Sequence, residues 1–285
     1  MSNLRFYLPT ELKREILETA VVDHPSCAPR ITLVSRAVHG WIELLMYETI
    51  ELKNRASLEG FARTISLKGT EFISKHVKML SIQFDEREEA LVVGPNPTGI
   101  IMSTCTGAET LCIWSHRHYI DILDWLRTTD LQLEPRRLCL KTWDLGIDDM
   151  FDHHASTIPL FFRGVTHLEL GDPWALSCWT SDIAQLPSLT HLALLYIEPS
   201  IESAIEAHIV DLQTILASSI LRVLILLSRA YFDEDGKRRN FYVEDQITDG
   251  RLVMMPLTDA PKRWADEYRT REPTMWSRAE SAVRH

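Results

Sequence analysis

The sequence has few of the residues on which disulfide-rich, nucleic-acid-binding and membrane proteins depend. It contains five cysteines, an odd number, and no CxxC pair; they are Cys27, Cys105, Cys112, Cys139 and Cys178. This spacing argues against a disulfide framework and against a structural zinc site, and it favours a reducing compartment. Basic residues are outnumbered, because 30 Lys and Arg stand against 40 Asp and Glu, a formal net charge of −10. That balance disfavours binding to nucleic-acid phosphates and to anionic membranes.

Long apolar runs and targeting signals are also absent from the sequence. Residues 1–7 contain no apolar segment typical of a secretory signal. The longest apolar stretches, such as residues 220–227, are interrupted and far shorter than a membrane span requires. We therefore expect a protein of the cytoplasm, the nucleus or both, with no cofactor and with neither nucleic acid nor membrane as a partner.

The sequence lacks the motifs of the common catalytic sites. There is no GxSxG or Cys/His signature, and no glycine-rich phosphate loop. One cluster contains possible metal ligands: Asp148, Asp149, Asp152, His153 and His154. Asp149 and His153 would share a helix face, but no third ligand is identifiable, so a solvated helix face explains the cluster better. We expect no catalytic, cofactor-binding or metal site, and an unrecognised enzyme is the weakest alternative.

The first fifty residues have the apolar spacing of short helices. From Pro9, which is tolerated at a helix start, the apolar residues Leu12, Ile16 and Leu17 follow at helical steps. Residues 23–29 contain two prolines and predict a loop. A second helical stretch is expected at about residues 31–47, and Gly40 favours a break within it.

This segment resembles an F-box, in the degenerate form common in fungal proteins. The resemblance lies in the run LPTELKREILETA and the later run LVSRAVHGWIELLMYETIEL. F-box helices bind the linker subunit of SCF-type, cullin-based ubiquitin ligases, so the resemblance implies docking to that subunit. The residues expected to take part in docking are Leu8, Pro9, Leu12, Ile16, Leu17, Leu33, Val34 and Trp41. The alternative is a helical cap that only seals the domain that follows.

The remaining sequence contains an apolar-x-apolar pattern that recurs eight times. Its first apolar residues are at positions 50, 80, 111, 138, 168, 192, 224 and 252, with intervals of 24 to 32 residues. Such alternation predicts short strands, each with one row of side chains facing inward. Segments with helical spacing lie between them, most clearly at residues 201–216. Strand, turn and helix in units of about thirty residues resemble leucine-rich repeats.

The fold expected from these patterns is α/β. We expect an F-box-like helical segment at residues 1–48 and an irregular leucine-rich-repeat solenoid at 49–285, with parallel strands on one side and helices on the other. A C-terminal helical cap is expected at about 256–285, with Trp264 and Trp276 in its core. The chain has only four asparagines and none follows a strand as the repeat motif requires, so other hydrogen bonds must join the turns. An open, doubly wound sheet is the rival fold.

Two histidines occupy equivalent positions on successive predicted strands. His167 and His191 each precede an inward leucine, so they should stack on the outward face of the strand row. We expect Thr166, His167, Glu169 and His191 to form a partner surface, with ordinary strand residues as the alternative. The function expected is that of a protein-binding adaptor, the substrate receptor of an SCF-type ubiquitin ligase. The alternative is a scaffold of the same origin that binds proteins outside any ligase.

Overall fold

The computed structural model describes residues 8–84, 97–115, 132–141, 158, 160–172, 175–199, 201–229, 237, 241–270 and 273–283. Within these ranges the chain has an α/β fold built on one parallel sheet of eight strands. The strands are β1 (Thr49–Leu52), β2 (Met79–Phe84), β3 (Thr110–Ser115), β4 (Arg137–Lys141), β5 (His167–Leu170), β6 (His191–Leu195), β7 (Val223–Ser228) and β8 (Leu252–Pro256). All eight predicted strands are confirmed.

The strand order in the sheet is the order of the strands in the chain, β1 to β8. A doubly wound sheet reverses its order part-way, so that alternative is wrong. The register places the eight predicted apolar residues opposite one another across the whole sheet. They are Ile50, Leu80, Leu111, Leu138, Leu168, Leu192, Leu224 and Leu252. This arrangement is compatible with a solenoid-like fold.

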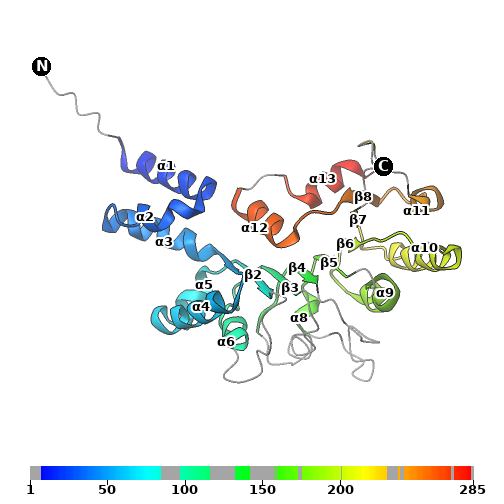
Figure 1. Cartoon of the computed structure of the whole chain (residues 1–285), viewed down its shortest axis with the longest axis horizontal. Coiled ribbons are helices and arrows are strands. Elements are labelled where there is room, and N and C mark those ends of the chain that lie inside the picture. Colours follow the sequence, from blue (N-terminus) through cyan, green and yellow to red (C-terminus); the bar gives the residue numbers. More distant parts are fainter. Residues whose placement is uncertain are drawn as a thin grey trace, which may run out of the picture.

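Helices between the strands cover the outer face of the sheet (Figure 1). They are α4 (Arg55–Lys68), α5 (Thr70–His76), α6 (Pro97–Thr104), α8 (Leu160–Arg163), α9 (Ala175–Gln185), α10 (Glu202–Leu216) and α11 (Tyr242–Gln246). Consecutive parallel strands joined by crossovers of one hand place their helices on one face. The aligned leucines point into this layer and form the larger core, together with buried side chains such as Leu58, Trp179 and Leu212.

Threonine hydroxyls take part in joining two of the turns. The hydroxyl of Thr166 donates to the carbonyl oxygen of Arg136 at 3.0 Å, and that of Thr190 donates to the carbonyl oxygen of Thr166 at 3.1 Å. Each bond links a strand start to the preceding one. The same carbonyl oxygens also accept from backbone N–H groups of the next strand start, so the hydroxyls add to the backbone bonds between turns.

The N-terminal helices form a separate small unit. It consists of α1 (Thr10–Asp23), the 3₁₀ turn η1 (Pro25–Cys27), α2 (Ala28–Ile31) and α3 (Arg36–Glu48). The loop predicted at residues 23–29 is therefore largely wrong, because its prolines stand in the first turns of η1 and α2, where a missing N–H costs little. The break predicted at Gly40 is also wrong. Helix α3 runs through Gly40 and begins after Ser35, whose hydroxyl accepts from Val38 N at 3.2 Å.

The C-terminal segment is helical, as predicted, but it forms two helices that do not close the end of the array. Helices α12 (Ala260–Thr270) and α13 (Met275–Ala282) lie along the inner face of the sheet instead of closing the end of the array (Figure 1). Helix α12 contacts β1, β2 and β3, and α13 contacts β7. The inner face carries apolar or small side chains such as Met79, Cys139 and Ile225, and covering them removes apolar surface from water. No helix in the described part of the chain is long and apolar enough to cross a membrane.

Candidate protein-binding sites

Six of the eight predicted docking residues are exposed on the N-terminal unit. The exposed fractions of Leu12 and Ile16 are 47% and 57%, and these residues lie one turn apart on the same face of α1. Leu8 is exposed just before that helix, as is Pro9. Leu33 and Val34, in the turn between α2 and α3, are 83% and 69% exposed. Exposed large apolar side chains at this density are typical of a contact surface.

The other two predicted docking residues have a structural role. Leu17 and Trp41 are half-buried and pack against the core of the N-terminal unit. That core is formed by the buried side chains of Val21, Ala28, Val38 and Ile42. Leu17 and Trp41 therefore help to hold the three helices together, and the other six residues are exposed.

A groove separates the N-terminal unit from the end of α12. Its volume is about 550 Å³, and its lining includes Val22, Leu45, Met46, Tyr268 and Arg269. The Tyr268 hydroxyl donates to a carboxylate oxygen of Glu48 at 3.4 Å, so the two walls of the groove touch at one end.

Glu169 lies at the centre of the inner face, beneath α12. Its side chain is fully buried and accepts hydrogen bonds from Trp264 Nε1 at 2.6 Å and from the Arg263 guanidinium. The guanidinium of Arg137 lies over the Trp264 ring, 5.1 Å from its centre. In this conformation the chain's own C-terminal helix covers Glu169, and its place on a partner surface stays a prediction.

His167 and His191 stack as predicted, at paired positions of β5 and β6. Their ring centres are 4.2 Å apart and the rings are nearly parallel. The edge of Trp276 from α13 meets both rings, and His191 Nε2 lies 2.9 Å from a carboxylate oxygen of Glu280. Thr166 is half-buried, and its hydroxyl lies 2.9 Å from His167 Nδ1. The histidine pair is therefore also covered by the C-terminal helices.

Burial controls the ionisation of this histidine pair. It lowers the pKa of His167 to about 3, with further lowering by His191 when that ring is protonated and by the positive charge of Arg137. Burial also lowers the pKa of His191, and the carboxylate of Glu280 opposes this change. Both rings are consequently neutral at neutral pH, which suits two imidazoles in face-to-face contact.

A second buried acid completes the charge balance of the inner face. The Glu267 carboxylate accepts from the backbone N–H of Met275 at 2.7 Å and lies 3.7 Å from the Arg137 guanidinium. Burial raises the pKa of Glu267, and the neighbouring guanidiniums oppose this change. Burial likewise raises the pKa of the Cys139 thiol, so this sulfur is not a ready nucleophile. The acidic and basic side chains of the inner face form ion pairs between the sheet and α12.

Sequence patterns did not predict the ionic part of this interface. Trp264 and Trp276 are 1% and 3% exposed, which confirms them as core residues. Arg263, Glu267 and Arg269 were missed, because their partners are far away in the sequence. The Asp148–His154 cluster lies outside the described residues. Among the residues that are described, no group of three or more His, Cys, Asp or Glu side chains is placed to hold a metal ion.

Comparisons with known proteins give no match to this chain, whether with protein-family models, with curated proteins or with solved structures.

Proposed function

We propose that this chain is a protein-binding adaptor, the substrate-receptor subunit of an SCF-type ubiquitin ligase. In this role the N-terminal unit is an F-box-like segment that docks to the linker subunit. The sheet and its helices form an irregular leucine-rich-repeat solenoid that binds the target. The adaptor contributes no chemistry of its own; it raises the effective concentration of the target beside the ligase.

The observation that carries the docking proposal is the exposed apolar face of α1. Leu12 and Ile16 project from it, and Leu8 precedes it, while the small core of the unit is already filled by other side chains. The core of a three-helix unit is so small that it contributes little stability alone. Burial of the exposed apolar face against a partner would therefore stabilise the unit. The same residues carry the F-box resemblance.

The prolines of the segment do not prevent its helical structure. Pro25 and Pro29 lie in the first turns of η1 and α2, where a missing N–H costs little, so they do not interrupt the helices. The turn that follows presents Leu33 and Val34 to solvent. Two separate elements of the unit therefore offer apolar side chains.

The repeat proposal is supported by the sheet. Its strands follow one another in order, recur at intervals of 24 to 32 residues and align one leucine-like position throughout. Threonine hydroxyls add hydrogen bonds between two pairs of successive strand starts.

A second candidate function is a scaffold that binds proteins outside any ligase. It is favoured by the contacts of α3 with β1 and α5, and by those of α1 with α12. An ion pair between Lys68 of α4 and Glu43 of α3 adds to this packing. In that case the N-terminal unit is a cap on the first strand, and its exposed face has another partner.

A pull-down of the full chain with the purified linker subunit separates the two functions. The native chain should bind, and a Leu12→Asp, Ile16→Asp variant should not, because it places two carboxylates in the apolar contact. Val210→Asp on α10 is the matched control, since Val210 is 60% exposed on a distant helix; it should bind normally. Equal melting temperatures of the three proteins verify that they are folded. Failure of the folded native chain to bind would favour the scaffold.

A further inference from the structure

We propose that the inner face of the sheet is a binding trough for an amphipathic helix with two basic residues about six positions apart. In this structure the trough is occupied by the chain's own α12, which a partner helix of the same kind displaces. The inference rests on the proposed protein-binding function but not on docking to a ligase.

The trough is formed by one row of side chains across five neighbouring strands. The paired positions are, in order, Glu51, Ser81, Cys112, Cys139 and Glu169. Three small side chains thus lie between two carboxylates. Neighbouring strands are about 4.8 Å apart, so the carboxylates stand about 19 Å apart along the row. Small residues let a helix approach closely, and an acid at each end selects a basic residue at each end of that helix.

Helix α12 shows how such a helix is held. Arg263 binds Glu169 at one end of the row, and Arg269 binds Glu51 at the other. Between them lies Ala265, which is fully buried and small. The six residues from Arg263 to Arg269 rise about 9 Å along the helix. The two extended arginine side chains span the rest of the distance between the two carboxylates. Beside Arg263, the Trp264 indole adds a hydrogen bond to Glu169. The partner therefore requires two basic residues, with an aromatic donor beside one of them.

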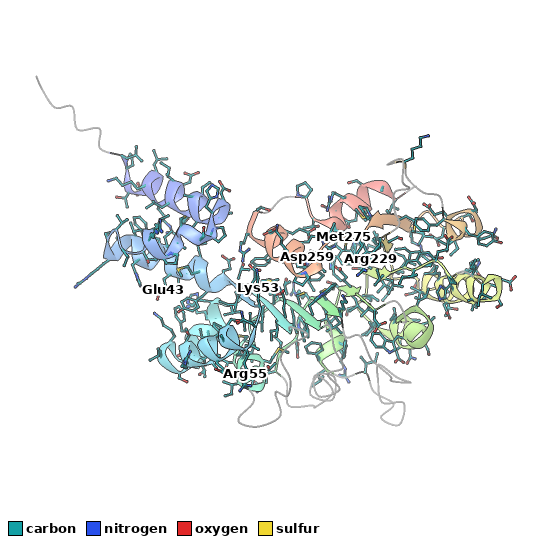
Figure 2. The ribbon with its side chains drawn as sticks, in the orientation of Figure 1. Glu43, Lys53, Arg55, Arg229, Asp259 and Met275 are labelled. Atoms are coloured by element: carbon teal, nitrogen blue, oxygen red, sulfur yellow. The ribbon has the colours of Figure 1, made fainter. Side chains whose placement is uncertain are left out.

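The outer core of the sheet does not depend on α12 and α13. One buried cluster lies between the sheet and the outer helices, and it contains no residue of the C-terminal helices. A separate cluster contains Trp264, Met275 and Trp276 with the inner-face residues. Met275, labelled in Figure 2, is the first residue of α13 and is buried in this second cluster. Release of the two helices would expose the second cluster and leave the first closed.

Several buried polar atoms at the interface between the sheet and helices α12 and α13 have no hydrogen-bond partner in the described part of the chain. Six buried polar atoms there lack a hydrogen-bond partner among the described residues: Ser81 Oγ, Arg137 Nε, Glu169 Oε1, Arg263 Nε, Glu267 Oε2 and Trp276 Nε1. Such atoms are costly to keep buried, but Trp179 Nε1, Tyr196 Oη and His208 Nδ1 in the outer layer also lack a partner within the described ranges, so they do not distinguish this interface. Buried ion pairs fix which segment binds and in which register more than they add stability. The two ion pairs, of Arg263 with Glu169 and of Arg269 with Glu51, therefore suit an occupant that is selected by its charges.

Competition by a synthetic peptide tests the displacement. A fluorescent peptide of residues 257–283 is titrated into the full native chain and into a full chain with Arg263→Ala and Arg269→Ala. The native α12 competes as an intramolecular ligand, so the peptide should bind the variant at least about 10-fold more tightly than the native chain. Arg55→Ala with Arg63→Ala, two exposed arginines of α4, is the matched control and should behave as the native chain does. A peptide with Arg263→Glu and Arg269→Glu should not bind.

Hydrogen exchange of the unaltered chain supplies an independent measurement. Amides of α12 and α13 should exchange through a local opening, well before those of β2 to β7. Equal protection of both groups, or equal peptide affinity of the native chain and the arginine variant, would overturn the proposal. Linker binding through α1 is measured in a separate experiment without this peptide, so failure of the trough leaves that proposal standing.

Discussion

Trp264 of α12 donates its indole N–H to the buried carboxylate of Glu169 in β5, at 2.6 Å. This bond joins residues 95 positions apart and anchors the C-terminal helices to the middle of the sheet. The same carboxylate binds Arg263, so an aromatic and a cationic donor converge on one acid. A carboxylate without exposure to water depends on both donors, because a buried charge without partners is costly.

Removal of this carboxylate should destabilise the chain strongly. Glu169→Ala leaves the Arg263 guanidinium buried without its main partner, which costs about 3–5 kcal/mol in the free energy of unfolding. Arg263→Ala combined with Glu169→Ala should cost less than the sum of the two single changes. Urea denaturation measures all three. Glu59→Ala, which breaks an exposed pair with Arg55, serves as the control and should cost under about 0.5 kcal/mol. Additive single effects would mean that the two residues are not coupled.

Mild acid should weaken the folded chain through His167. Its pKa is about 3 in the folded chain and near 6.5 when unfolded, so the unfolded chain binds the proton more readily. The contribution of His167 to the free energy of unfolding is therefore retained above pH 6.5 and is lost as the pH drops toward 3. At pH 5.5 the loss from this partly exposed residue is at most about 1.4 kcal/mol, and His191 adds to it in the same direction.

His167→Gln isolates this contribution, because glutamine does not titrate. The free energy of unfolding is measured by urea denaturation at pH 7.5 and pH 5.5 for both proteins. The native chain should lose more stability between these values than the variant. Equal losses would assign the acid sensitivity to other groups.

The strands were predictable because their signal is local. Alternation of apolar residues over four positions and its return after about thirty residues are properties of the sequence itself, and the sheet aligns those same positions. The Gly40 break failed for a physical reason. Val38 and Ile42 on either side are buried on one helix face, and this packing outweighs the weak helix propensity of one glycine.

The place of the C-terminal helices could not be predicted from local patterns. It depends on pairs such as Arg269 with Glu51, which are 218 positions apart. Sequence spacing predicted that His167 and His191 stack, because both lie on neighbouring strands. It could not predict that Trp276 would cover them, since a helix of that composition can also close the end of an array.

Replacement of Arg251 by lysine should destabilise the folded chain. Its guanidinium donates to the carbonyl oxygens of Ser218 and Leu221, at 3.1 and 3.0 Å, and to that of Leu216 at the end of α10. It also pairs with Asp249, whose pKa it lowers. A lysine ammonium cannot reach these acceptors together, so Arg251→Lys should cost about 2 kcal/mol in unfolding free energy.

The control for Arg251 is the same change at a nearby exposed arginine. Arg222→Lys should alter the free energy of unfolding by less than about 0.5 kcal/mol. If both variants unfold at the same urea concentration as the native chain, the guanidinium of Arg251 does not stabilise the end of α10.

Two glycines should respond to alanine in opposite directions. A Cβ at Gly107, before β3, would overlap the backbone carbonyl oxygen of Ser74 in α5, and backbone cannot move aside cheaply. Gly107→Ala should therefore cost about 1–3 kcal/mol. Gly40 lies inside α3, and a Cβ added there would meet no atom within 4 Å, so Gly40→Ala should add about 0.5–1 kcal/mol by favouring the helix. Thermal unfolding of the two variants beside the native chain measures both shifts. The continuous helix α3 argues against any need for flexibility at Gly40. A fall in melting temperature for Gly40→Ala would contradict this prediction.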